Sequence, residues 1–179
     1  FDEKVAMYRV SLKDGSLISS VVIDDKTILS AYSVAIVNLN NDRDKQLLIN
    51  NHEKDDATNG VFAYTFPKDL MKGEWKKTTL ASNFKKKFSL FVPNMSPGFP
   101  YNFWPKVADE GKKPGHILVA GDGDYTASIM TPTGKLAYNI DPIKDMGGTV
   151  GALTWGDLNN DGWNELFIPN YDKSYVKIY

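Results

Sequence analysis

The chain contains no cysteine, which excludes disulfide bonds, catalytic thiols and cysteine-ligated metal sites. It has no apolar run of the roughly 20 residues that a membrane-spanning helix needs, and no segment with the pattern of a signal peptide. Histidine is scarce: His52 and His116 are the only two, and neither has the spacing of a metal site or a catalytic triad. The net charge of −1 gives no general attraction to nucleic acid. We therefore expect no membrane span and no nucleic-acid partner.

β-forming sequence, by contrast, is abundant. Residues 5–10, 16–23 and 60–66 are rich in β-branched and aromatic residues and are separated by turn-forming clusters. Helical periodicity is scarce along the chain. With 179 residues, of which 42% are hydrophobic, the chain can bury one substantial core. The sequence therefore predicts an all-β fold.

One loop, residues 157–165, reads DLNNDGWNE and is followed directly by an apolar, strand-like run. Its oxygen-bearing side chains alternate along the chain, which is the arrangement that a hard divalent cation needs, and its glycine gives the backbone freedom to curl around one ion. We call it the Asp157 loop. Its candidate ligands are the side chains of Asp157, Asn159, Asp161 and Glu165 and the backbone carbonyl of Trp163.

An EF-hand shares the opening of this loop, but it needs a bidentate Glu at the twelfth position and a helix on each side. Counting from Asp157, the twelfth residue is Ile168, inside the apolar run. Residues 149–155 upstream show no helical stripe. The sequence therefore excludes an EF-hand, and the remaining alternative to a metal site is a plain acidic turn.

A second copy of the motif lies near the start of the chain, because residues 37–49 align with residues 156–168 without a gap. We call this copy the Asn38 loop. It places the following residues at the five ligand positions: Asn38, Asn40, Asp42, Asp44 and Gln46.

A third, eroded copy consists of residues 107–109 followed by 116–120, with Asp109 in the place of Asp157. A strand–loop–strand unit of this size cannot bury a core alone, so several copies predict a repeat architecture. We expect one domain over residues 1–179 with about three repeats, whose motif copies lie near residues 33–51, 105–121 and 150–171.

Residues 147–171, GGTVGALTWGDLNNDGWNELFIPNY, resemble the FG-GAP/VCBS repeat of integrin α-chain-type β-propellers. Residues 33–51, SVAIVNLNNDRDKQLLINN, are similar but degraded. The resemblance implies β-propeller blades and calcium in the Asp157 loop. In the Asn38 loop, Arg43 replaces the turn glycine and carboxylates are few, so calcium there is expected to be weaker or absent. The Asp109 copy is expected to bind no metal.

A proline- and aromatic-rich stretch, residues 93–105, interrupts the strand pattern. Proline lacks the N–H donor of a central strand, so this stretch is predicted not to form one. Its rings could form a stacking platform for a sugar or a peptide, or they could simply pin the loop to the fold. The candidate ligand-binding residues are Phe99, Tyr101, Phe103 and Trp104.

Three repeats are too few to close a propeller, which typically has four to eight blades, and the chain begins at Phe1. We therefore expect a segment of a larger propeller, completed by another segment or subunit. Extracellular calcium would fill such loops best, so we expect a secreted or surface location. The expected function is a calcium-stabilised binding or adhesion module for a glycan or protein ligand. The alternatives are a scaffold propeller of a carbohydrate-active enzyme and a structural subunit of an extracellular assembly. No catalytic residue is assigned.

Overall fold

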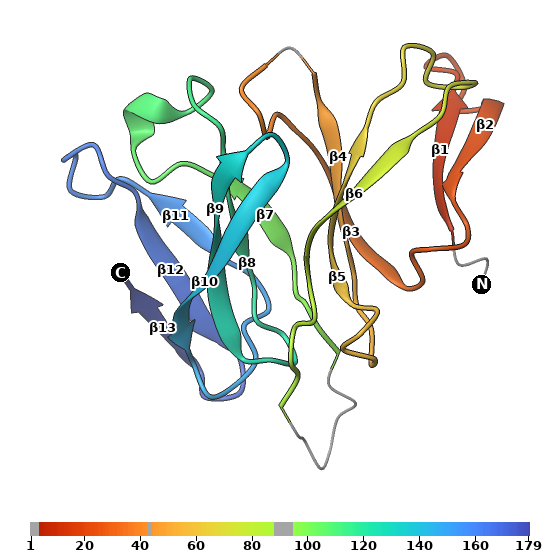
Figure 1. Cartoon of the computed structure of the whole chain (residues 1–179). Helices are drawn as coiled ribbons and strands as arrows, with labels where there is room; N and C mark the ends of the chain where they lie inside the picture. Colours follow the sequence, from red (N-terminus) through yellow and green to blue (C-terminus); the bar gives the residue numbers. More distant parts are fainter. Residues whose placement is uncertain (1–3, 43, 88–94) are drawn as a thin grey trace.

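The computed structural model describes residues 4–42, 44–87 and 95–179, and these residues form strands and one short 3-10 helix, η1 (Val107–Asp109) (Figure 1). The strands are β1 (Val5–Val10), β2 (Leu17–Asp24), β3 (Ala31–Val37), β4 (Gln46–Asn51), β5 (Gly60–Thr65), β6 (Lys76–Ser82), β7 (Pro100–Phe103), β8 (His116–Val119), β9 (Thr126–Gly134), β10 (Ala137–Asp145), β11 (Thr154–Gly156), β12 (Glu165–Asn170) and β13 (Tyr175–Ile178). The prediction of an all-β fold is confirmed. No helix in these three described ranges could span a membrane.

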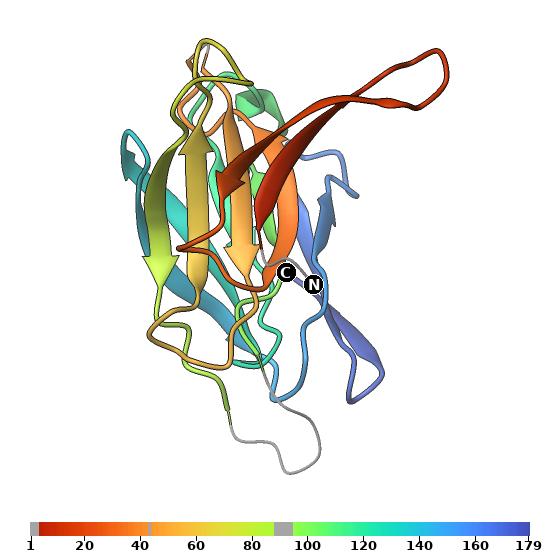
Figure 2. The ribbon, with the colours of Figure 1, turned by 90° about the vertical axis from the view of Figure 1, so that its right-hand side faces the viewer.

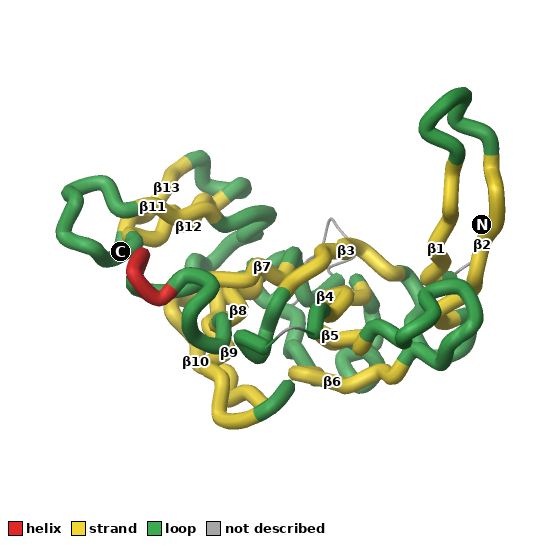
Figure 3. The backbone as a smooth tube through the Cα atoms, turned by 90° about the horizontal axis from the view of Figure 1, so that it is seen from above, coloured by secondary structure: helices red, strands yellow, loops and turns green. Residues whose placement is uncertain are grey.

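The strands form antiparallel sheets in which neighbours in sequence are neighbours in space. Their orders are β1-β2, β3-β4-β5-β6, β7-β8-β9-β10 and β11-β12-β13. The sheets stand side by side in a row, with β1-β2 at one end and β11-β12-β13 at the other (Figure 1). Seen from above, β3 and β7 lie along one side of the row and β6 and β10 along the other (Figure 3).

Each of the three acidic segments joins the first strand of a sheet to its second, and all three lie at the same end of the sheets (Figure 1). The Asp157 and Asn38 loops also share one strand register. The pairs that flank the Asn38 loop are Val37↔Gln46, Ile36↔Leu47 and Ala35↔Leu48, and those that flank the Asp157 loop are Gly156↔Glu165, Trp155↔Leu166 and Thr154↔Phe167. The two copies are therefore the same structural unit.

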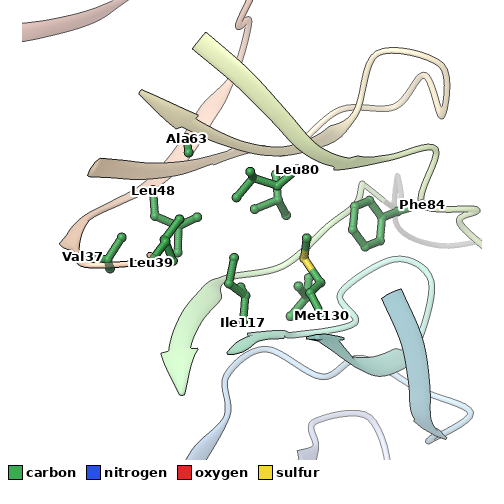
Figure 4. Close-up of a cluster of buried hydrophobic side chains, with 10 residues drawn as sticks. Val37, Leu39, Leu48, Ala63, Leu80, Phe84, Ile117 and Met130 are labelled. Carbon is green, nitrogen blue, oxygen red and sulfur yellow. The ribbon is translucent and has the colours of Figure 1, made fainter. Parts of the chain in front are cut away.

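The sheet β7–β10 is apolar on both faces, because successive side chains of a strand point to opposite faces. Ile117 and Met130 pack against the sheet β3–β6 (Figure 4), whereas Leu118 and Ala127 pack against the sheet β11–β13. All four side chains are fully buried. The middle sheet thus holds its two neighbours in place.

A third cluster joins the hairpin β1–β2 to the outer face of the sheet β3–β6, at the end of the row (Figure 2). Val5 of the hairpin packs there with Ile49 and Phe62. Tyr64 donates a hydrogen bond of 2.6 Å to Asp24. Partial burial by itself raises the pKa of the Asp24 carboxyl, but the donors Thr27 and Tyr64 and two backbone N–H groups outweigh it and lower that pKa.

We expect Leu48→Ala to lower the free energy of unfolding by about 2–5 kcal/mol, because Leu48 is fully buried between two sheets and the truncation leaves a cavity. Leu12→Ala is the matched control, since Leu12 is fully exposed in the β1–β2 turn, and should change the value by less than about 0.5 kcal/mol. Urea unfolding measures both. Equal losses would contradict the assigned core.

Candidate metal-binding loop

The Asp157 loop connects β11 to β12 and turns sharply, with Asn160 at φ 62° and Gly162 at φ 89°. A left-handed φ is strained for residues with a Cβ and unstrained for glycine, while asparagine tolerates it better than most residues. These two positions let the loop reverse within a few residues, so that the ends of β11 and β12 meet at the pair Gly156–Glu165.

Side-chain oxygens hold this turn by accepting hydrogen bonds from the loop's own backbone. Asp157 accepts from the N–H groups of Asp161 (3.1 Å) and Gly162 (2.9 Å). Asn159 Oδ1 accepts from Asp161 N at 2.8 Å, and Asp161 Oδ1 accepts from Trp163 N at 2.8 Å. The loop is therefore shaped by the same residues that the sequence predicts as ligands.

The remaining oxygens converge on the amide of Asn159. Its Nδ2 donates to Asp161 Oδ2 (3.0 Å) and to Glu165 Oε1 (3.2 Å). Glu165 Oε2 accepts from Leu158 N at 2.8 Å. The amide hydrogens of Asn159 thus lie between two carboxylates. A cation at this place would be attracted more strongly than these amide hydrogens are. This oxygen-only donor set fits a hard divalent cation.

The predicted backbone ligand, the carbonyl of Trp163, points away from the neighbouring segment around Lys106. Residue Trp163 pairs with Lys106 through hydrogen bonds from Val107 N to Gly162 O (3.1 Å) and from Asn164 N to Pro105 O (2.9 Å). In this antiparallel pattern the N–H and C=O of the paired residue itself point away from its partner. The Trp163 ring is half-exposed, with the Lys106 ammonium 4.3 Å from its centroid.

In the described ranges, no three His, Asp or Glu side chains lie close enough together to hold a metal ion by themselves. The fit of the Asp157 loop to calcium therefore depends on amide and backbone oxygens as well as carboxylates. Asp157 in particular already uses both oxygens for backbone N–H groups.

The Asn38 loop has the same register, but its Gln46 side chain is satisfied by the backbone of the loop itself. Gln46 Oε1 accepts from Leu39 N at 3.0 Å, which copies the bond between Glu165 and Leu158. Its Nε2 then donates to the carbonyl of Asp44 at 2.9 Å, the position that corresponds to Trp163. A glutamine amide thus donates to the backbone of this loop, where the other copy has a carboxylate oxygen that accepts from the amide of Asn159.

A lysine from the next sheet supplies positive charge to the Asn38 loop. Lys135, in the β9–β10 turn, places its ammonium 3.3 Å from Asp42 Oδ2 and 3.9 Å from Asp44 Oδ2. Leu136 N donates to Asn40 Oδ1 at 3.1 Å, and Asn38 Nδ2 donates to the carbonyl of Asp42 at 2.7 Å. Arg43 lies outside the described residues. Sequence reasoning missed Lys135, because nothing in the local pattern connects it to a loop so far away.

The third copy does not form a comparable loop. Asp109 lies in η1 and pairs with Lys113, whose ammonium is 3.1 Å from the carboxylate. The segment between β7 and β8 is longer than the other two loops, and its residue Gly111 has a φ of 66°. This segment instead supports the Asp157 loop, through the pairing of Lys106 with Trp163.

The four aromatic candidates do not form one flat platform. Phe99 stacks on Tyr32 at 4.6 Å, and Tyr101 meets Phe99 edge-on at 6.4 Å. Phe103 is buried and packs edge-on against Trp155 at 5.4 Å. The indole N–H of Trp104 donates to the carbonyl of Lys113 at 2.8 Å. Two of the four, Phe103 and Trp104, thus serve the fold of the loop and the core.

His52, directly after β4, contacts the segments that hold Met95 and Asp122. Its Nε2 lies 2.9 Å from Asp122 Oδ2 and 2.8 Å from the carbonyl of Met95, and its ring stacks on Tyr32 at 4.3 Å. Since both faces of the Tyr32 ring are covered, by His52 and Phe99, a sugar cannot stack on it.

Comparison with protein-family models, with curated proteins and with solved structures finds no match.

We expect Gln46→Ala to lower the free energy of unfolding by about 2–4 kcal/mol, because the variant strands the buried N–H of Leu39 and a backbone carbonyl. The loss should be equal with calcium and with EDTA. Lys135→Met, which removes an exposed ion pair, should cost less than about 1 kcal/mol. Urea unfolding tests both; a Gln46→Ala loss that depends on calcium would contradict a Gln46 side chain that bonds only to the loop backbone.

Burial raises the pKa of the Asp124 carboxyl to about 6 from 3.8. As the pH rises from about 4 to 6 the unfolded chain loses this proton before the folded one, so stability falls across that window. Asp124→Asn should therefore stabilise the protein by about 1–3 kcal/mol at pH 8 and give no such gain at pH 3.5. Urea unfolding at the two pH values measures this, and a gain of equal size at both would refute the assignment.

Proposed function

We propose that the chain forms consecutive blades of a β-propeller of the FG-GAP/VCBS type and binds one calcium ion in the Asp157 loop. The shared register of the Asp157 and Asn38 loops is the observation that carries this proposal, because it makes the acidic loop a fixed part of a repeating sheet. Two complete four-stranded antiparallel sheets with strands in chain order support it, since this is the construction of a propeller blade.

Calcium in this loop would join two strands. Asp157 directly follows β11 and Glu165 begins β12, so one ion held by both ties the ends of these strands together. Asp161 lies between them in the sequence, and the oxygens of the Asn159 amide and the Trp163 carbonyl would add to those of the carboxylates around the ion. Since these carboxylates would be occupied by the ion and the backbone, the role of the metal is to stabilise the fold.

The protein so stabilised would act outside the cell as a binding or adhesion module for a glycan or protein ligand. Loops that bind calcium at about 10⁻⁴ to 10⁻³ M are typical of extracellular modules. Exposed Trp163, beside Lys106, stands at the calcium end and offers a ring to a ligand there. Half-buried Tyr101 and Trp155, on the first strands of two sheets, give aromatic contacts along one side of the row.

Thermal melting with calcium and with EDTA tests the proposal. At 10 mM calcium, an affinity in the stated range stabilises the folded state by about 1.4–2.7 kcal/mol, which corresponds to a rise in Tm of about 3–10 °C for a chain of this size. Asp161→Ala should abolish this rise and leave the Tm in EDTA nearly unchanged.

Asp42→Ala is the matched control, because Asp42 holds the corresponding position of the Asn38 loop and faces Lys135 instead of a metal. The calcium-dependent rise should persist in this variant. A rise that Asp161→Ala leaves intact, or no rise in the unmodified protein, would refute calcium binding in the Asp157 loop.

A further inference from the structure

The sheet β3–β6 has an apolar face that its neighbour covers only in part. Rows of side chains cross this face, and one row runs from Ile36 on β3 through Leu47 on β4 to Tyr64 on β5. Leu47 and Tyr64 are buried in the cluster beneath the β1–β2 hairpin, whereas Ile36 is 65% exposed. In the parallel row, Val34 is exposed beside buried Ile49. The two-stranded hairpin therefore covers β4 and β5 and leaves β3 open.

A groove of about 750 Å³ lies where this cover is missing. One wall is strand β1, including Met7 and Tyr8, and the other contains Tyr32, Val34 and Ile36 of β3. Within the described residues β1 pairs only with β2. The other edge of β1, which borders the groove, therefore has no strand partner there. The groove is continuous with the buried cluster under the hairpin, because Leu47 and Ile49 line both.

The opposite end of the row also presents an open apolar face. In the sheet β11–β13, Ile168 and Tyr175 point toward the sheet β7–β10. Phe167 pairs with Ile178, and these residues, with Val176, share the other face. Ile178 is 58% exposed. This sheet therefore has one face packed and one face uncovered in the described chain.

The two open faces are related in the same way as the two faces that already pack inside the chain. We call the face of a sheet that is turned toward the preceding strands of the chain its earlier face, and the opposite face its later face. Each internal contact joins the later face of one sheet to the earlier face of the next, as in the cluster that contains Leu48 and Ile117. The open face of β11–β13 is a later face, and the open stripe on β3 is an earlier face. A contact between them would join a later face to an earlier face, as both internal contacts do, and would lie on β3 because the hairpin covers β4 and β5.

We propose that a second copy of the chain seats its β11–β13 sheet in the groove between β1 and β3. Val176 and Ile178 of one copy then lie against Val34 and Ile36 of the other. The contact is head-to-tail, so copies close into a ring or grow into a chain according to the rotation between them. The inference rests on the row of blade-like sheets in the proposed function and not on its calcium ion.

Because the chain has no cysteine, single engineered cysteines report this contact without background. Ile36→Cys and Ile178→Cys proteins, mixed and treated with a short bismaleimide, should give a product of twice the 20.0 kDa chain mass. Ile36→Cys alone should give at least about tenfold less, because a head-to-tail contact does not bring two equivalent positions together. Leu12→Cys mixed with Ile178→Cys is the control, because Leu12 is more exposed than Ile36 but does not line the groove, and it should give equally little.

Sedimentation of the cysteine-free protein gives an independent readout. Assemblies larger than one chain should form with rising concentration, and Val34→Lys, at an exposed position, should reduce them while circular dichroism stays unchanged. A mixed product no greater than the Leu12→Cys control, or a single chain at all concentrations, overturns the docking. If calcium still raises the Tm in that case, the proposed function stands without the docking of a second copy.

Discussion

The central strands carry apolar side chains on both of their faces, and the rest of the structure depends on this constraint. Ile117 and Leu118 are neighbours in sequence and fully buried in different cores, because they point to opposite faces of β8. A sheet of this kind needs a neighbour on each side. The position of β7–β10 between two other sheets follows from that requirement.

The two copies of the acidic loop show how one backbone can be completed by different chemistry. In both copies the side chain of the ninth loop residue accepts a hydrogen bond from the backbone N–H of the second loop residue. The ninth residue is Gln46 in one copy and Glu165 in the other. The remaining atom then decides the outcome. An amide nitrogen donates to a backbone carbonyl and closes the loop internally, whereas a second carboxylate oxygen adds negative charge that attracts a cation. In the first copy, Lys135 of the adjacent sheet supplies a positive charge.

The sequence predicted what depends on local pattern. β-forming runs predicted the fold class, and the gap-free alignment of residues 37–49 with 156–168 agrees with the identical strand register found in the structure. Contacts between distant segments could not be predicted in the same way. Phe103 lies among loop aromatics in the sequence, but the position of Trp155 buries it. Lys135 belongs to a turn whose approach to Asp42 is set by the packing of two sheets.

The number of calcium ions per chain tests this account most directly, because the Asp157 and Asn38 loops differ in a few atoms around one backbone plan. Equilibrium dialysis at millimolar calcium measures that number for the unmodified protein and for a Glu165→Gln variant, which copies the chemistry of the Asn38 loop. The account predicts one ion per chain and none in the variant. Two ions in the unmodified protein, or one that persists in the variant, would contradict it.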